Sequence, residues 1–361
     1  MHSAIRFRLA RIPRRLLLCI VLVALVILAI RAALPFVLRH AFNERLARVE
    51  GYAGHVGGVD FQLFRGAYQL EGVTVHKRVD GRLEPLLDVR EIDFSLAWRE
   101  LLHGRVVSDI VLTEPRLRIT TSTTPDDPRG DGRQWQDAIR DIFPIEITHF
   151  RIIRGDIRFI DETSSPRVDI PLRELELVAL GLRNQPDETT GPFPARLYAE
   201  AVTAGEGRLT LFITGDPLSV SPRFNFKLDL VDLQLKALNS FLEAYANVDV
   251  SAGTLKLYSE IYANDGAFEG YVKPFFEDLE FKNLADKDKN LARRIWENLV
   301  AGAAAIVENN ERNQVATRIP ISGRFGDTDV GIWATIGGLM RNGFIKALSE
   351  GRESEKPVAT D

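Results

Sequence analysis

Acidic residues are the side chains of this sequence whose number and spacing come closest to those of a catalytic site. Asp229 and Asp232 lie close together, and Asp156 and Asp161 flank a short apolar segment. Paired carboxylates act as general acid and general base when their surroundings separate their pKa values. Asp229, however, belongs to a run of alternating apolar and polar residues and is expected to face solvent, while Asp156 and Asp161 suit turns at strand ends. We therefore predict that neither pair is catalytic.

The other reactive residue types lack the spacing of a catalytic or metal site. Cys19 is the single cysteine and lies in an apolar run, so the rest of the chain has neither a disulfide nor a cysteine nucleophile. The sequence contains no nucleophile elbow, P-loop, zincin motif or dinucleotide-binding glycine pattern. The six histidines are dispersed, without the spacing of metal ligands: His2, His40, His55, His76, His103 and His149. We predict a protein that is not an enzyme and that uses no cofactor or metal.

The first element that would position a functional surface is an apolar N-terminal segment. Residues 1–15 contain five arginines and no acid, and residues 16–30 contain no charged side chain. Extended to residue 38, the apolar stretch reaches the roughly 20 residues that cross a bilayer as a helix. The basic leader favours a cytoplasmic N-terminus, and Arg31 interrupts the A-x-A-like pattern at which a signal peptide would be cleaved. We therefore predict a cytoplasmic leader, 1–15, and an uncleaved transmembrane anchor, 16–38.

Basic residues near the outer end of this anchor are candidates for contact with the membrane surface. Three of them fall on an expected helix over residues 34–49, where they would meet lipid headgroups or form a solvated helix face. The sequence leaves these two alternatives open. The membrane-proximal candidates are Arg31, Arg39, Arg45 and Arg48.

The composition of the exported part is that of a globular chain. Hydrophobic residues make up 45% of the sequence and charged residues 27%, which is enough apolar surface for a core. The formal net charge is −4, and no basic stripe follows the leader. These features exclude nucleic acid as an expected partner.

Alternation of apolar and polar residues predicts that the exported part is mainly β. Roughly a dozen such runs, separated by short turns, are typical of antiparallel strands with one solvated face. Helical spacing appears near the C-terminus and in residues 235–246, where Leu238, Phe241, Leu242 and Tyr245 share one face. The expected order is an N-terminal β module (39–121), a loop or linker (122–134), the main antiparallel sheet (135–285), two helices with a strand between them (286–350) and a disordered tail (351–361).

The clearest alternation collects large apolar side chains on one face of the predicted sheet. Such a face must be covered by another layer of the protein or by an amphipathic ligand. Periodicity alone favours the first alternative, a closed sandwich core. The candidates for an apolar groove, the second alternative, are Leu209, Leu211, Phe224, Phe226, Leu228, Leu230, Leu255 and Leu257.

A family resemblance favours the groove. The pattern begins with a hairpin and strands over residues 59–120, with Gly72-Val73-Thr74-Val75 in the hairpin and Thr113-Glu114-Pro115-Arg116 near the end. It continues with Gly270-Tyr271-Val272-Lys273-Pro274 and with Ile319-Pro320-Ile321-Ser322-Gly323 before the last helix. This order resembles the AsmA-like bacterial envelope proteins, in particular a short subfamily with a single anchor, over most of residues 50–350. The polar loop near residue 122 and the short length depart from the large family members.

The resemblance implies a long, curved antiparallel sheet, related to that of bridge-like lipid-transfer proteins, with an apolar concave face. It implies a protein of the bacterial inner membrane whose bulk lies in the periplasm, and which binds or helps to transfer phospholipid. The C-terminal helices are expected to cap the open end of the sheet. The alternative is a structural or assembly factor with a closed core that binds other envelope proteins.

Overall fold

The computed structural model describes most of the predicted β region. The described residues are 14–48, 51–62, 67–79, 81–96, 107–121, 146–182, 195–216, 223–246, 248–264, 266–282, 314–316 and 318–324. The first part of the predicted leader, the predicted linker, the two predicted C-terminal helices and the predicted tail lie outside the described residues.

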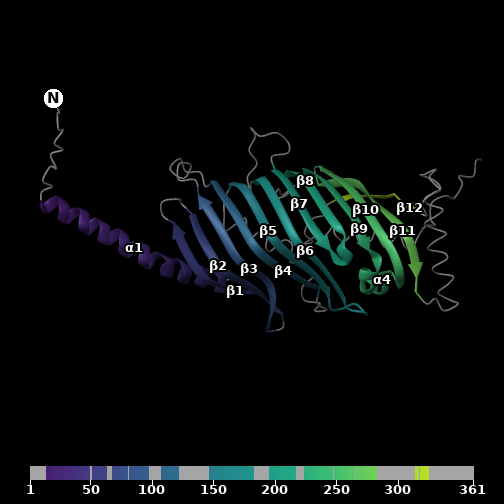
Figure 1. Ribbon diagram of the computed structural model, residues 1–361, viewed down its shortest axis with the longest axis horizontal. Coiled ribbons are helices and arrows are strands. Elements are labelled where there is room, and N and C mark those ends of the chain that lie inside the picture. Colours follow the sequence, from purple (N-terminus) through teal and green to yellow (C-terminus); the bar gives the residue numbers. More distant parts are fainter. Residues whose placement is uncertain are drawn as a thin grey trace, which may run out of the picture.

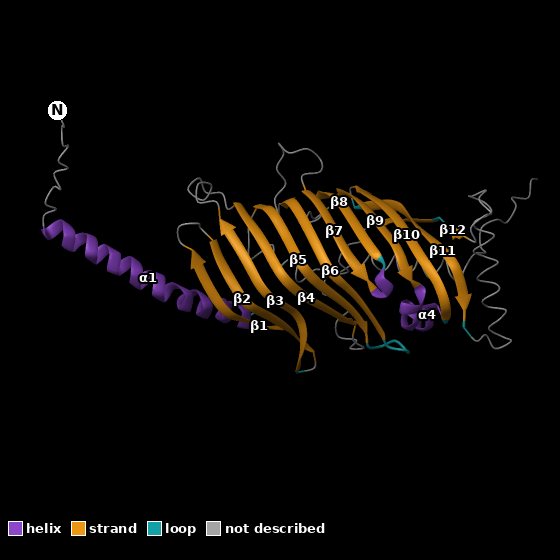
Figure 2. Cartoon of the chain, viewed as in Figure 1, coloured by secondary structure: helices purple, strands orange, loops and turns teal. Residues whose placement is uncertain are grey.

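Most of the described chain forms one thirteen-stranded sheet that is long, curved and unclosed (Figures 1 and 2). Strands β1 to β11 follow one another across the sheet in chain order, and β12 and β13 both pair with β11. The mainly β fold predicted from the alternation is therefore confirmed. The strands are β1 (Tyr52–Gln62), β2 (Ala67–Val79), β3 (Arg82–Leu96), β4 (Val107–Thr121), β5 (Glu146–Asp161), β6 (Val168–Leu182), β7 (Ala195–Thr203), β8 (Arg208–Asp216), β9 (Arg223–Gln234), β10 (Val250–Asn264), β11 (Ala267–Phe281), β12 (Gln314–Ala316) and β13 (Ile319–Arg324).

One strand pair departs from the antiparallel pattern that the sequence predicts. β4 and β5 are parallel, and every other pair is antiparallel. A parallel pair needs a crossover connection of a dozen or more residues, and residues 122–145 provide one of that length. The sheet continues without a break through this point.

A line of left-handed backbone conformations, which we call the bulge line, crosses the sheet and bends its strands. Glu114 on β4, Arg154 on β5, Glu174 on β6 and Asp232 on β9 have φ values of 52°, 51°, 54° and 59°. The strand register shifts beside Arg154, Glu174 and Asp232. Such β-bulges bend a strand and increase its twist. Because they lie on strands across the sheet, their bends combine into a curved surface.

The helices lie at the margins of the sheet. α1 (Arg14–Ala47) contacts β1 and extends away from that edge (Figure 1). Two 3-10 turns, η1 (Ala204–Glu206) and η2 (Leu235–Leu238), and the short helix α4 (Asn239–Ala246) lie near the other end. η2 and α4 together form the helix that the sequence predicts over residues 235–246.

α1 changes character along its length. Its first half carries exposed apolar side chains, which are Leu18, Val21, Leu22, Val23, Leu25, Val26 and Leu28. The part of the chain that the structure describes contains no helix both long enough and apolar enough to be identified as a membrane span. Near its C-terminus, Phe42 and Leu46 pack against the buried residues Val56, Leu70, Val73 and Val89. The Asn43 amide also accepts from the N–H of Val56 at 2.7 Å and donates to its carbonyl at 3.3 Å, so α1 occupies hydrogen-bonding groups of the edge strand.

Candidate functional site

A series of side chains that are apolar at every position except one crosses one face of the sheet, and we call this face the apolar face. Residues that are direct partners in neighbouring strands point to the same side of a sheet. Only one polar residue, Ser259, interrupts the series formed by such partners from β1 to β13. Its members are Val59, Leu70, Ile92, Leu112, Ile152, Leu177, Ala199, Leu211, Leu228, Ser259, Val272 and Ile319.

A second series beside it is also apolar. It consists of Tyr68, Phe94, Ile110, Phe150, Ala179, Leu197, Ile213, Phe226, Ile261, Gly270 and Ile321. Eleven spacings of about 4.8 Å give the first series a length of about 53 Å. The apolar face is therefore continuous over the whole width of the described sheet.

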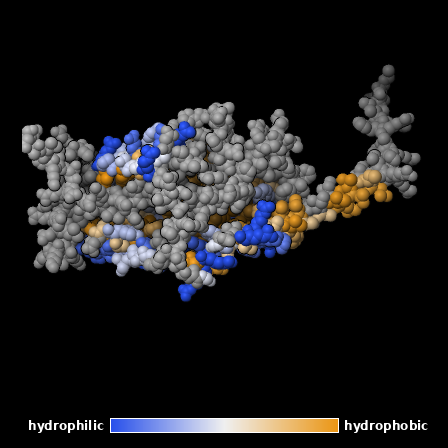
Figure 3. Space-filling model, turned by 180° about the vertical axis from the view of Figure 1, so that it is seen from behind, coloured by the Kyte–Doolittle hydropathy of each residue, from blue (hydrophilic) through white to orange (hydrophobic). Residues whose placement is uncertain are grey.

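The apolar face is incompletely covered at its centre. Apart from the buried Pro115 and Gly155, the apolar-face residues of β4 and β5 are half-buried or, in the case of Ile119, 44% exposed. We call this region the open strip; it comprises Ile110, Leu112, Leu117, Ile119, Phe150, Ile152, Ile157 and Phe159. In Figure 3, hydrophobic residues are visible in a recess between more hydrophilic margins. The open strip offers aliphatic and aromatic surface that a ligand can cover.

The eight groove candidates lie at the other end of the same face, on β8, β9 and β10. Five of them are almost completely buried: Phe224, Phe226, Leu230, Leu255 and Leu257. Leu209, Leu211 and Leu228 are half-buried. The register therefore brings together the residues that the alternation selects, but most of them are core residues in this conformation. We call this region the covered end.

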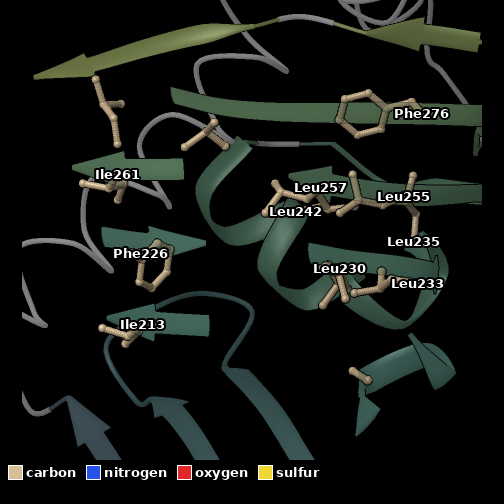
Figure 4. Packing of buried hydrophobic residues seen from close by; sticks show 14 of the residues in the cluster. Ile213, Phe226, Leu230, Leu233, Leu235, Leu242, Leu255, Leu257, Ile261 and Phe276 are labelled. Carbon is tan, nitrogen blue, oxygen red and sulfur yellow. The ribbon is translucent and has the colours of Figure 1, made fainter. Parts of the chain in front are cut away.

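The η2–α4 segment provides part of the cover. Leu235 and Leu242 are 1% exposed and belong to one buried cluster with Leu230, Leu233, Leu255 and Leu257. Figure 4 shows Leu242 beside Leu257, with Leu235 near Leu255 and Leu233. The sequence predicts the amphipathic helix but does not indicate which surface it covers.

The end of the apolar face next to α1 carries an aromatic stack. The ring centroids of Phe42 and Tyr68 lie 6.3 Å apart, and those of Tyr68 and Phe94 lie 4.7 Å apart and nearly parallel. Burial raises the pKa of Tyr68 to about 12, because the phenolate loses hydration in this apolar setting. The stack connects α1 directly to the apolar face, a contact for which the sequence gives no signal.

The membrane-proximal arginines lie on α1. Arg39, Arg45 and Arg48 are exposed, and Arg48 forms an ion pair with Glu44 one helical turn away. Arg31 is a position of the same helix, but its side chain lies outside the described residues. Of the three described side chains, those of Arg39 and Arg45 extend into solvent without a salt bridge to another described residue.

Three of the four acidic residues considered for catalysis have structural partners, whereas Asp156 lies inside β5 and not in the strand-end turn that the sequence predicts. Asp229 lies 3.9 Å from Lys227, and Asp232 pairs with Arg208 at 2.8 Å. Both pairs lie on the side of the sheet opposite the apolar face, which we call the polar face. Asp161 is only 6% exposed. One of its carboxylate oxygens accepts from the backbone N–H and hydroxyl of Thr163 at 2.8 and 2.7 Å, and the other accepts from the Tyr245 hydroxyl. The turn predicted at Asp161 is present, and the link to Tyr245 is additional.

The polar face carries charge along the bulge line. Arg154 pairs with Glu114 at 2.8 Å, and Arg90 lies 3.2 Å from the same carboxylate. The hydrogen bond from Arg154 and the nearby positive charges lower the pKa of Glu114.

The described residues include no group of three or more His, Cys, Asp and Glu side chains arranged to hold a metal ion. Searches against models of known protein families and against curated proteins return no match.

Proposed function

We propose that this protein binds phospholipid along its apolar face and helps to transfer it in the bacterial envelope, without catalysing a reaction. The observation that carries the proposal is the pair of apolar series that cross an unclosed sheet and are only half-buried on β4 and β5. A sheet with one apolar face is stable only when that face is covered. An acyl chain is a flexible apolar ligand that can cover it.

The dimensions of the face suit acyl chains. The hydrocarbon core of a bilayer is about 30 Å thick, so one chain of a phospholipid spans about 15 Å. A series about 53 Å long is thus roughly three times the length of one acyl chain. Each methylene removed from water contributes about 0.8 kcal/mol, so an acyl chain on the open strip is strongly favoured over one in water.

A membrane anchor is part of this proposal. The basic leader and the uncharged run in residues 16–30 favour insertion with a cytoplasmic N-terminus, and the exposed leucines of α1 support this placement. The bulk of the chain then lies in the periplasm beside the inner membrane. The motif order that resembles AsmA-like proteins is consistent with this location. We also propose that residues 286–350 cap the β11 end of the sheet.

The alternative is an assembly factor of the envelope, and one observation favours it. Val178, Leu180, Tyr198 and Phe212 form a patch on the polar face, each between 38% and 44% exposed. Val178, Tyr198 and Phe212 are direct partners on β6, β7 and β8, and Leu180 lies beside them on β6. Exposed apolar patches of this kind often bind other proteins. The buried covered end also fits a protein whose core is closed.

Native mass spectrometry of the detergent-solubilised full chain separates the two proposals. A lipid-binding protein is expected to retain phospholipid adducts after mild detergent exchange. A chain that stays free of lipid when incubated with dioleoyl phosphatidylglycerol would contradict lipid binding and favour the assembly factor.

A further inference from the structure

We infer that the covered end of the apolar face is a second, cryptic site for acyl chains, and that the η2–α4 segment is its lid. This inference rests on the proposed function and adds a regulated site to it. The lid is formed by Leu235–Leu238 and Asn239–Ala246. It covers apolar side chains that continue the open strip across β8, β9 and β10.

The lid contacts the sheet through the same kind of surface that an acyl chain offers. Leu235, Leu238 and Leu242 lie in one cluster with the apolar-face residues of β9 and β10 (Figure 4). α4 has eight residues, which is too short for a helix that is stable on its own in water. Its conformation therefore depends on packing against the sheet. A lipid chain that occupies these contacts replaces the lid.

The start of α4, inside the lid, is fixed by one asparagine. The side-chain N–H of Asn239 donates to the Asp249 carboxylate at 2.5 Å and to the Val250 carbonyl at 2.9 Å. Its side-chain oxygen accepts from the Val250 N–H at 3.1 Å. These bonds tie the start of α4 to the start of β10. The middle of the lid is therefore fixed to the strand that follows it.

The C-terminal end of the lid is held by the N–H of the buried Val248, which donates to the Leu242 carbonyl at 3.2 Å, and by a hydrogen bond to a distant turn. The Tyr245 hydroxyl donates to the carboxylate of Asp161, which lies 84 positions earlier at the end of β5. Asp161 is 6% exposed, and Thr163 holds its other oxygen in place. A hydrogen bond to a buried carboxylate is stronger than one between neutral groups. We call this contact the latch.

The position of the latch gives it a role in access. Asp161 ends β5, the strand that carries Ile157 and Phe159 of the open strip, and α4 also contacts β6. The latch therefore joins the lid to the boundary between the open strip and the covered end. Release of Tyr245 loosens the end of α4 that lies at this boundary, where the hydrogen bond from the Val248 N–H to the Leu242 carbonyl then remains. The two regions then become one continuous path for acyl chains.

Tyr245→Phe tests the latch with little disturbance of packing. It removes the hydroxyl and keeps the ring that lies 4.9 Å from that of Phe241. Tyr262→Phe is the matched control, because Tyr262 is 44% exposed on the other face of β10. Hydrogen exchange of the α4 amides and native mass spectrometry with dioleoyl phosphatidylglycerol are measured on the detergent-solubilised full chain.

In Tyr245→Phe, we expect exchange of the α4 amides to be about tenfold faster or more, the effect of losing one charge-assisted hydrogen bond. We also expect a larger maximum number of bound lipids than in the wild type and in Tyr262→Phe. Unchanged exchange overturns the latch. Faster exchange without additional lipid overturns the cryptic site, provided that the wild type binds lipid. A wild type that binds none contradicts the proposed function and the lipid part of this inference, whereas the exchange result still decides the latch.

Discussion

A charge placed on the apolar face is expected to have opposite consequences at its two regions. Leu177 on β6 is half-buried and is the direct partner of Ile152 in the open strip. Leu255 on β10 is 2% exposed and lies beneath the lid. Substitution of each by glutamate introduces the same carboxylate on the same face. Leu180→Glu is the control, because Leu180 is 40% exposed on the polar face of β6.

The magnitudes follow from burial. In Leu255→Glu the buried carboxyl must be neutral, and protonating a group of pKa about 4.3 at pH 7 costs about 3.7 kcal/mol. Loss of the buried leucine adds about 1.5–3 kcal/mol. The total of about 5–7 kcal/mol is comparable to the whole stability of a typical domain. In Leu177→Glu the carboxylate reaches water, and we expect a loss of only about 1–2 kcal/mol.

Lipid binding should show the reverse sensitivity. An acyl chain on the open strip would have to desolvate the carboxylate introduced by Leu177→Glu or force it to take up a proton. The penalty of about 3.7 kcal/mol corresponds to a more than 100-fold weaker complex. Leu177→Glu is therefore expected to fold and to lose lipid, Leu180→Glu to fold and keep it, and Leu255→Glu not to fold. Thermal unfolding and native mass spectrometry of the solubilised chains measure both properties.

Two results would refute this reasoning. If Leu177→Glu unfolds as completely as Leu255→Glu, the centre of the apolar face is a closed core. If Leu177→Glu folds and keeps the lipid content of Leu180→Glu, lipid does not bind on this face.

Two further predictions concern the backbone and the aromatic stack. Glu174 has φ 54° and is exposed, so Glu174→Gly is expected to relieve strain and raise the free energy of unfolding by about 1 kcal/mol. Glu269→Gly, at an ordinary strand position, should lower the free energy of unfolding by about 0.5–1 kcal/mol. Equal losses in the two variants, measured by thermal unfolding, would show that Glu174 is unstrained. Tyr68 has a folded-state pKa raised to about 12 by burial, so its contribution to stability is complete below the unfolded value of about 10 and is lost as the pH rises through 12. Tyr68→Phe should therefore weaken the fall in melting temperature between pH 10 and 12, and an unchanged pH profile would contradict the assigned cause.

The alternation of the sequence predicts the fold class and the composition of the apolar face because both depend on local periodicity. Phe224, Phe226, Leu228 and Leu230 share a face in the structure for the reason that predicts it, since every second side chain of a strand points the same way. The face on which each side chain of a single strand lies can therefore be predicted from the sequence.

Pairing between strands is less predictable because its signals are not the usual ones. Left-handed positions in strands are normally glycine or asparagine, but here Glu114, Arg154, Glu174 and Asp232 occupy them. The bulge line is therefore invisible to a search for turn residues. The parallel pairing of β4 with β5 likewise depends on where a long connection returns. The hydrogen bond between Tyr245 and Asp161 depends on both the bulges and the parallel strand pairing, because together they set where the end of β5 lies.

Connections, more than strands, determine which part of the apolar face is accessible. The strands of the open strip and of the covered end carry similar apolar side chains in the same two series. Among the connections that the structure describes, the one between β9 and β10 contributes Leu235, Leu238, Leu242 and Val248 to the cluster that buries the covered end. The β10–β11 connection is a tight turn with Gly266 at φ 73° and adds no such cover. Strand patterns therefore indicate which face is apolar, whereas the β9–β10 connection decides how far one end of that face is buried.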